Sequence, residues 1–456
     1  MSRSFFSSTG LAVAAMSITA LGCSPDRGGE QQSGSGIIPT TTGTAGATGT
    51  ATANTAGMTA GDSDGIRLDV GTNDGGGNNG DCSGGGGGNG DIEFSYIWIA
   101  NSAEGTVSKI DTKTGVEVGR YYTDPSMGGG SPSRTSVNLL GDVAVSNRWP
   151  ASTTKVAARP ERCVDLNNNG MIDTSTGPAD VRPWGQDECV LWNTPFPDAA
   201  GYTQGARPTQ WEGGQADQNG CADPNPRLWV AYEDAAGQAH VVRLDGETGT
   251  ILDEVTTPWS AAGIGSGFGP YGGVVNAEGD LYVSGLGGIG RLLHVDADTL
   301  AITDLGNPGT SFYGIGIDQD GNPWIVGGSQ ASVWDATTLS WTVIDTPNGS
   351  LRGVQVDREG RAWAAGNSPC GLVVFDVATR TVLNGQVDLP GCTVPVGISI
   401  DAEGYVWSPD MSSNLAFKVD PNTFAVTLSV TGLNQPYTYS DMTGAGLGLV
   451  TNPPAG

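Results

Sequence analysis

The second half of the chain repeats a pattern of short apolar and polar alternations. Each unit passes from one alternating run through a turn of the form (Asp or Asn)-x-(Asp or Glu)-Gly into a second run that carries a large aromatic residue. A third run ends at an Asp-x-x-Thr turn, whose Asp we expect to cap the turn rather than to join a ring of carboxylates. The aromatics recur at spacings of 42, 39 and 44, at Tyr282, Trp324, Trp363 and Trp407. This periodicity predicts four short strands per unit.

Units of this kind are the blades of a β-propeller, in which only the neighbouring blades cover the apolar faces, so the ring has to close. We predict an all-β, seven-bladed propeller of four-stranded antiparallel blades in residues 92–456, with six or eight blades as alternatives. The first unit starts directly at its aromatic strand, Tyr96-Ile-Trp98, and we expect the C-terminal segment from Tyr439 to Val450 to supply the missing strand. The predicted blades cover residues 94–123, 133–193, 207–256, 270–305, 312–346, 351–389 and 395–430.

The Gly-x-x-x-Asp-x-x-Gly-x-x-Trp units and the Asp-x-x-Thr turns resemble those of propellers that include NHL repeats and streptogramin (virginiamycin B) lyases. The resemblance covers about residues 92–451 and implies the fold. It also implies a candidate activity, because those lyases open a cyclic depsipeptide with His and Glu side chains near a bound magnesium ion. His240 and His294 are the two histidines here, and neither lies in a His-x-x-Glu or His-x-His arrangement that would indicate a general base.

The charge balance narrows the classes of partner. The chain has 48 acidic and 21 basic residues and a formal net charge of -27, which repels nucleic acids and anionic lipid surfaces. We therefore predict no nucleic-acid partner. The closed repeat, together with the lack of an assembled acid/base constellation in the sequence, predicts a binding module for a protein, peptide or carbohydrate ligand in the cell envelope. The alternative is a lyase of the streptogramin B lyase type.

The N-terminus has the features of an export signal. Residues 1–22 contain Arg3 and an apolar run from Leu11 to Leu21, and the small residues before Cys23 resemble the lipobox of bacterial lipoproteins. The resemblance implies that Cys23 is lipidated and, with Ser24 after it, that the protein is retained at the outer membrane. An ordinary cleaved signal with a chance cysteine is the alternative. Membrane contact is then expected through the lipid anchor only.

Residues 23–91 are rich in Gly, Ser, Thr, Ala and Asn and contain no aromatic residue. Such a composition buries too little apolar surface to offset the entropy of ordering, so we predict a disordered tether. Its root-mean-square reach is on the order of 45 Å. The tether would hold the propeller clear of the membrane.

The segment 158–188, inserted between two strands of the second blade, contains a calcium-loop-like motif. Oxygen-bearing side chains occupy loop positions 1, 3, 5 and 9, and the residue at position 7 offers its carbonyl, as in EF-type calcium loops. The predicted calcium ligands are Asp165, Asn167, Asn169, Met171 and Asp173. Position 12, which is normally a bidentate Glu, is Thr176. Asp180, Asp187 or Glu188 would have to fold back to complete the coordination of Ca²⁺.

Seven cysteines minus the lipidated Cys23 leave six, an even number that suits an oxidising compartment. The predicted topology places the cysteines of each pair on the same face of the propeller. The expected disulfides are Cys370–Cys392, Cys163–Cys189 at the base of the calcium-loop insertion, and Cys82–Cys221 as the remainder.

Overall fold

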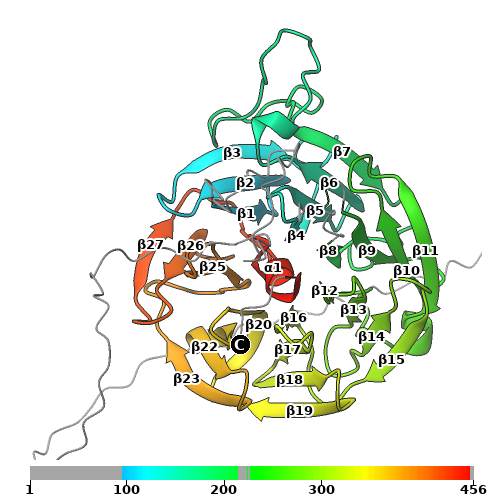
Figure 1. Cartoon of the computed structure of the whole chain (residues 1–456), viewed down its shortest axis with the longest axis vertical. Helices are drawn as coiled ribbons and strands as arrows, with labels where there is room; N and C mark the ends of the chain where they lie inside the picture. The colour runs from blue at the N-terminus through cyan, green and yellow to red at the C-terminus, as the bar shows by residue number, and fades with distance from the viewer. Residues whose placement is uncertain (1–94, 214–222, 224–225, 452–456) are drawn as a thin grey trace, which may run out of the picture. The chain divides into compact units, whose positions relative to one another are not determined.

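The structure is a computed structural model that describes residues 95–213, 223 and 226–451. The predicted signal peptide at 1–22, lipidated Cys23, tether at 23–91, Cys82 and Cys221 all lie outside the described residues. The described residues form a ring of seven antiparallel sheets around a central channel, which confirms the predicted seven-bladed propeller (Figure 1).

Six of the seven blades run from an inner strand A to an outer strand D, the first blade has three strands, and strand order follows chain order. The first three blades contain β1 (Tyr96–Asn101), β2 (Thr106–Asp111), β3 (Glu117–Tyr122); β4 (Pro132–Val137), β5 (Val143–Asn147), β6 (Ser152–Val156), β7 (Val190–Pro195); and β8 (Thr209–Trp211), β9 (Leu228–Glu233), β10 (Gln238–Leu244), β11 (Ile251–Pro258). The fourth and fifth contain β12 (Gly272–Val275), β13 (Leu281–Ser284), β14 (Leu292–Val295), β15 (Ile302–Gly306); and β16 (Gly314–Ile317), β17 (Pro323–Gly327), β18 (Gln330–Asp335), β19 (Ser340–Asp345). The last two contain β20 (Gly349–Val356), β21 (Arg361–Ser368), β22 (Cys370–Asp376), β23 (Thr381–Val387); and β24 (Ser399–Ile400), β25 (Val406–Asp410), β26 (Leu415–Val419), β27 (Val426–Val430). Short 3-10 turns lie at Pro160–Arg162 and Ser260–Ala262.

The repeated Asp and Trp positions form one recurring contact that ties strand B to the A–B turn. In three blades the buried indole N–H donates to the aspartate six residues earlier, at 2.8–3.0 Å, in the pairs Trp324–Asp318, Trp363–Asp357 and Trp407–Asp401. The Asp-x-x-Thr turns are capped in the same repetitive way. At Asp245, for example, the backbone N–H and the hydroxyl of Thr248 both donate to the carboxylate at 2.8 Å. The prediction that the aspartates of the Asp-x-x-Thr turns cap those turns is confirmed.

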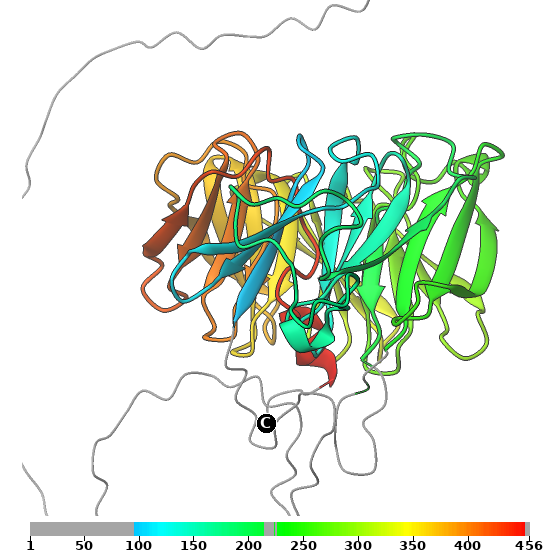
Figure 2. The same ribbon diagram turned by 90° about the horizontal axis from the view of Figure 1, so that it is seen from above.

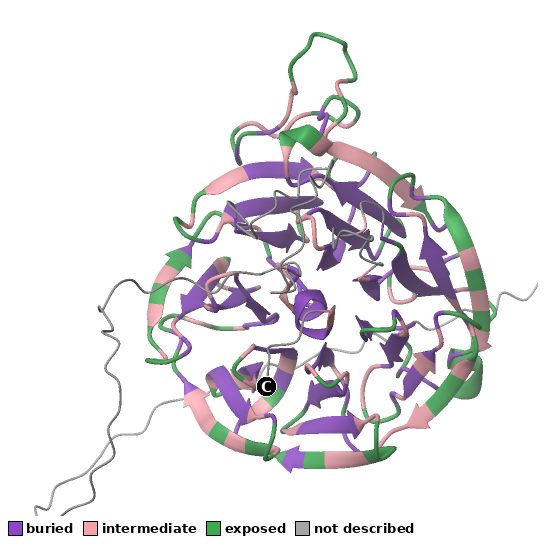
Figure 3. Cartoon of the chain, viewed as in Figure 1, coloured by how far each residue is buried: buried purple, intermediate pink, exposed green. Residues whose placement is uncertain are grey.

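Burial falls from the channel outward, because inner strands are covered by their neighbours while outer strands face solvent (Figure 3). Strand β5 is buried throughout, whereas β11 alternates between exposed and half-buried residues. Large aromatics fill the wedges between blades, and Trp98, Trp324, Trp363 and Trp407 are fully buried. Among the described helices, none has the length and apolar character needed to cross a bilayer.

The C-terminal segment closes the ring, but not as the strand that the sequence suggested. Its backbone lies beside β1, where the N–H of Trp98 donates to the carbonyl of Met442 at 2.9 Å, yet the first sheet has three strands only. From Ala445 to Thr451 the chain forms helix α1, so the predicted strand is wrong there. The physical reason is a cap: the buried carboxylate of Asp441 accepts hydrogen bonds from the N–H groups of Gly444 and Leu447.

Two of the predicted disulfides are present. Cys163–Cys189 joins the ends of the insertion between β6 and β7, and Cys370–Cys392 links the start of β22 to the loop before β24. The insertion therefore leaves and re-enters the ring at a covalently fixed base.

Candidate functional site

The two histidines lie on opposite faces of the propeller. His240 is next to the B–C turn of the third blade, with Nδ1 at 2.6 Å from Glu254 and Nε2 at 3.3 Å from Asp234. His294 bonds Asp280 in the A–B turn of the fourth blade, with Nε2 2.9 Å from the carboxylate. A–B and B–C turns emerge at opposite ends of a blade. The two histidines therefore cannot serve one site.

The predicted calcium-loop residues come together in the insertion. The N–H groups of Asn169 and Gly170 donate to the carboxylate of Asp165 at 3.2 and 2.9 Å. Both side-chain amides, of Asn167 and Asn169, donate to the same oxygen of Asp173 at 2.8 and 2.9 Å, and these two hydrogen bonds lower the pKa of Asp173. Four of the five predicted side chains thus converge. Met171, the fifth, exposes its side chain and belongs to the motif through its carbonyl.

Of the three carboxylates considered for position 12, the structure places Glu188 at the loop. Its buried carboxylate accepts the N–H of Leu166 at 2.8 Å and the N–H of Asp173 at 2.7 Å. Asp180 instead bonds Thr176. Asp187 accepts hydrogen bonds from the hydroxyl of Thr174 and from the N–H groups of Ser175 and Cys189, and does not bond the loop's oxygen cluster.

A second cluster, which the sequence reasoning missed, surrounds one end of the channel. Successive A strands begin at this end, so the first residues of the strands meet there. The cluster also includes Arg148 from a B–C turn and two residues of the C-terminal segment. We call this cluster the Arg–Tyr mouth; its members are Arg134, Arg148, Arg207, Arg352, Tyr271, Tyr313, Tyr437 and Tyr439.

Glycines at or just before the start of strand A allow this crowding. A Cβ atom on Gly314 would lie 1.9 Å from the carbonyl oxygen of Arg352, and one on Gly397 would lie 2.2 Å from that of Thr438. No side chain is tolerated at such distances. Neighbouring inner segments therefore approach backbone to backbone, and the residue before each glycine is directed into a narrow mouth.

The four tyrosines join their hydroxyl groups at the centre of the mouth. The hydroxyl oxygen of Tyr271 lies 2.8 Å from that of Tyr439 and 3.0 Å from that of Tyr437. The hydroxyl of Tyr313 lies 2.8 Å from that of Tyr437 and accepts a hydrogen bond from Nη1 of Arg352 at 2.6 Å. The hydroxyls of Tyr437 and Tyr439 also contact each other. One network therefore joins the fourth and fifth blades to the C-terminal segment.

The arginines stack on these rings and bond to neutral oxygens. Arg134, which is 1% exposed, has its guanidinium carbon 3.8 Å from the ring centroid of Tyr439, and its Nε has no hydrogen-bond partner in the described structure. Its other hydrogen bonds end on the carbonyls of Ser133 and Tyr271. Arg207 is 2% exposed and likewise donates to backbone carbonyls, including that of Thr203 at 2.7 Å.

The charges of the mouth perturb its titrating groups. Burial, together with the positive charges of Arg134 and Arg148, lowers the pKa of Arg207 to about 10. Burial alone would raise the pKa of Tyr271, but the charge of Arg134 and the hydrogen bonds from the other three tyrosines lower it below its ordinary value. Burial raises the pKa of Tyr439 instead. The mouth thus favours negative charge on one of its own phenols.

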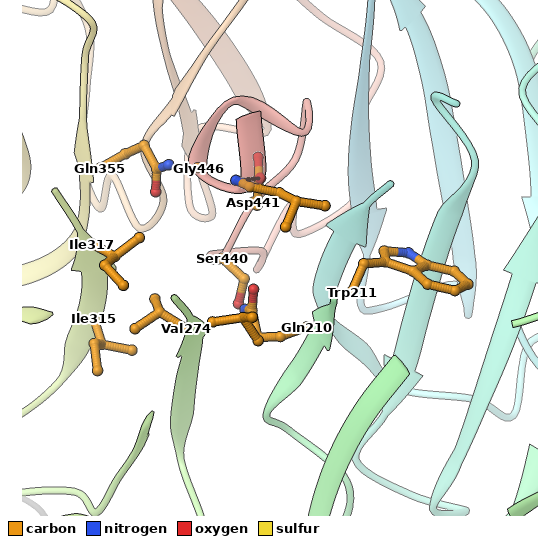
Figure 4. Close-up of a pocket in the computed structure, with 11 residues that line it drawn as sticks. Gln210, Trp211, Val274, Ile315, Ile317, Gln355, Ser440, Asp441 and Gly446 are labelled. Atoms are coloured by element: carbon orange, nitrogen blue, oxygen red, sulfur yellow. Dashed lines mark hydrogen bonds between the residues drawn. The ribbon is translucent and has the colours of Figure 1, made fainter. Parts of the chain in front are cut away.

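The other end of the channel is closed by helix α1, which Figure 2 shows at one face of the ring. Ala445 and Leu449 of α1 pack beside the A–B turn segments 356–359 and 400–404. Between α1 and the mouth lies a small cavity with room for about one water molecule (Figure 4). Asp441 and Gln355 are among its polar lining residues. Helix α1 and the Arg–Tyr mouth therefore lie at opposite ends of the channel.

A signal for this mouth was present in the sequence. The repeated units begin Tyr271-Gly, Tyr313-Gly, Arg352-Gly and Val396-Gly, so in three of the four units a tyrosine or an arginine precedes the glycine. A comparison of the residues at this same position in successive blades would have indicated a ring of side chains at the channel. The spacing of residues within one segment does not show it.

Neither a protein-family model nor a curated protein matches this chain. Solved structures match its architecture. A functionally unknown protein from Desulfotomaculum acetoxidans is 11% identical with a TM-score of 0.53, covering 75% of this chain and 96% of that chain. A virginiamycin B lyase from Staphylococcus aureus is 14% identical (TM-score 0.48, 69% and 89% covered), and apo AztD from Citrobacter koseri is 13% identical (TM-score 0.46, 76% and 97% covered). At these identities the likeness extends to the propeller fold.

Proposed function

We propose that this protein is an exported propeller, lipid-anchored through Cys23 to the cell envelope, that binds a ligand at the Arg–Tyr mouth. The observation that carries the proposal is a channel closed by α1 at one end and lined at the other by charged and aromatic side chains. Concave sites with an apolar body and a few convergent polar groups are typical of ligand binding. A tether of residues 23–91 would hold this mouth away from the membrane, most simply the outer membrane.

A binding role fits the chemistry better than catalysis. The two histidines lie on opposite faces, and the groups that converge at the mouth are guanidiniums and phenols. The resembled lyases use His and Glu side chains together on one face. We therefore expect purified protein to leave a streptogramin B intact, and ring opening that is lost in the His240→Ala or His294→Ala protein would contradict the proposal.

The ligand-binding role is tested on protein isolated from the envelope of its source organism. Native mass spectrometry should detect a non-covalent adduct on the wild-type protein. The Arg352→Gln, Tyr437→Ala protein should lose the adduct, because both side chains line the accessible part of the mouth. The matched control is Arg291→Gln, which removes an exposed arginine paired with Asp304 on the outer edge of its blade. An adduct retained by the mouth variant would contradict the proposal.

We further propose that a calcium ion stabilises the insertion between β6 and β7. Asp165, Asn167, Asn169 and Asp173 offer side-chain oxygens, which are the ligands that this hard cation prefers. The amide nitrogens of Asn167 and Asn169 both face Asp173, so a half-turn of each amide would present oxygens to the same point. Glu188 would complete the set in place of a position-12 glutamate. The ion would supply a fixed charge at the centre of the loop.

The calcium proposal is tested by thermal unfolding with and without added Ca²⁺. Saturating metal should raise the melting temperature by several degrees, since binding at 100 times Kd stabilises by about 2.7 kcal/mol. Asp165→Ala and Glu188→Gln should abolish the shift. Asp180→Ala is the matched control, because Asp180 lies in the same insertion but bonds Thr176. A full shift in the Asp165→Ala protein would contradict the site.

The lipid anchor is tested separately, by mass spectrometry of the mature N-terminus. We expect the mature chain to begin at Cys23 and to carry acyl chains. A mature terminus at another residue, without added lipid mass, would refute the anchor and leave the ligand and calcium proposals standing.

A further inference from the structure

The Arg–Tyr mouth concentrates positive charge without carboxylate partners. Arg134, Arg148, Arg207 and Arg352 form no ion pair with any acidic residue in the described part of the chain, although other arginines, such as Arg120, do. Their hydrogen bonds end on carbonyl and hydroxyl oxygens. In a chain with a net charge of -27, four such guanidiniums at one site are a marked exception.

Buried cations without counter-charges are costly, and stacking on aromatic rings offsets only part of that cost. The guanidinium carbon of Arg148 lies 4.7 Å from the ring centroid of Tyr202 and 4.8 Å from that of Tyr437, and Arg352 lies 5.0 Å from Tyr313. These contacts place the cations but leave their charge uncompensated. The lowered pKa of Tyr271 has the same origin, because the positive charge of Arg134 favours the ionised form of this phenol. An anion from outside would meet the same field.

The rim of the mouth is apolar. Phe268, Leu286, Val394 and Met411 are half-buried and pack against the cluster of Tyr271, Val396 and Tyr439. Tyr202 lies beside Arg148 and Arg207 and is 47% exposed. A ligand that enters here contacts apolar and aromatic surface first and guanidiniums below it.

We propose that the ligand of the Arg–Tyr mouth is a small organic anion, in which a carboxylate or phosphonate group binds the arginines and an aromatic or aliphatic body packs on the rim. This inference rests on the proposed ligand-binding function and names the ligand's chemistry. Arg352 is half-buried and Arg148 is 8% exposed, so they are the first cations an incoming anion reaches. Arg134, with its unpartnered Nε, lies deeper and adds to the field that holds the anion.

The test is isothermal titration of the full-length protein with probes that share one ring and differ in charge: benzoate, phenylphosphonate, benzamide and benzylamine. Benzoate or phenylphosphonate should bind, and benzamide and benzylamine should not at about 10 mM. Comparison of the two anions shows which acid group the mouth prefers. Arg352→Gln should weaken anion binding at least about tenfold, because it removes a charge-assisted hydrogen bond. Arg352→Lys, which keeps the charge, should restore part of it.

Two controls keep the outcomes separate. Arg291→Gln should bind the anions as the wild type does, and near-ultraviolet circular dichroism should show that the Arg352 variants are folded. Equal anion affinity in wild type and in Arg352→Gln, Arg148→Gln would overturn the inference, and so would a wild type that binds neither anion. Benzamide or benzylamine binding that is lost in Tyr437→Ala would also overturn it, while leaving a ligand-binding mouth in place. Native mass spectrometry of the protein from the envelope then tests the proposed ligand binding independently of the ligand's chemistry.

Discussion

Substitution of Met442 is the strongest test of how the ring closes. Its side chain is 0% exposed and packs with Ile97, Ile99 and Trp407, so it joins the C-terminal segment to the first and last blades. Full burial of a Met side chain contributes about 1.5–3 kcal/mol, and truncation adds a cavity term. We therefore expect Met442→Ala to lower the free energy of unfolding by about 2–4 kcal/mol.

The assay is guanidinium chloride unfolding followed by tryptophan fluorescence, with the change in free energy taken from the midpoint shift and the common slope. Met442→Leu, which nearly conserves volume, should cost less than about 1.5 kcal/mol. Met411→Ala is the matched control, because Met411 is only half-buried at the mouth. A loss below about 1 kcal/mol for Met442→Ala would refute the conclusion that this segment seals the ring.

Three further predictions follow from the titrating groups and the disulfides. Absorbance at 295 nm should show one tyrosine ionising below the ordinary pKa of 10; Tyr271→Phe should remove this component and Arg134→Gln should shift it upward. Burial opposes protonation of His240, but the carboxylates of Glu254 and Asp234, which accept from its ring nitrogens and attract its positive charge, raise its pKa above 6.5. The charged form of His240 therefore stabilises the fold fully below pH 6.5, and this contribution fades as the pH rises through the raised pKa. His240→Gln should thus lower the melting temperature at pH 5.5 more than at pH 8.5, and an equal loss at both would contradict the assignment. The Cys370→Ser, Cys392→Ser protein should lose about 2–4 kcal/mol of stability in the same unfolding assay, and no loss would contradict a stabilising bridge.

The repeat carried most of the information about the fold. The blades repeat the same residues because each blade packs against its neighbours in the same way. These residues are the turn aspartates, the strand B tryptophans and the glycines between them, and the hydrogen bond that Trp363 donates to Asp357 is one example. Local pattern therefore sufficed for the blades, the insertion and the pairs Cys163–Cys189 and Cys370–Cys392.

Prediction from the repeated pattern failed where the structure depends on a contact that is not part of the repeat. The alternation of Gly and apolar residues in Gly444–Val450 is compatible with a strand, but Asp441 accepts the N–H groups of Gly444 and Leu447 and starts a helix. The Arg–Tyr mouth was missed for a related reason. Its members are separated by up to 305 residues along the chain, from Arg134 to Tyr439, and closure of the ring alone brings them together.

The placement of Tyr437 and Tyr439 has a consequence for how the mouth is assembled. Both tyrosines follow the last blade in the sequence, and they complete the hydroxyl network with Tyr271 and Tyr313. A chain that ends before residue 437 would lack half of that network, even though the strands of all seven blades precede that position. If the mouth binds a ligand as proposed, binding would therefore require this segment as well as the blades.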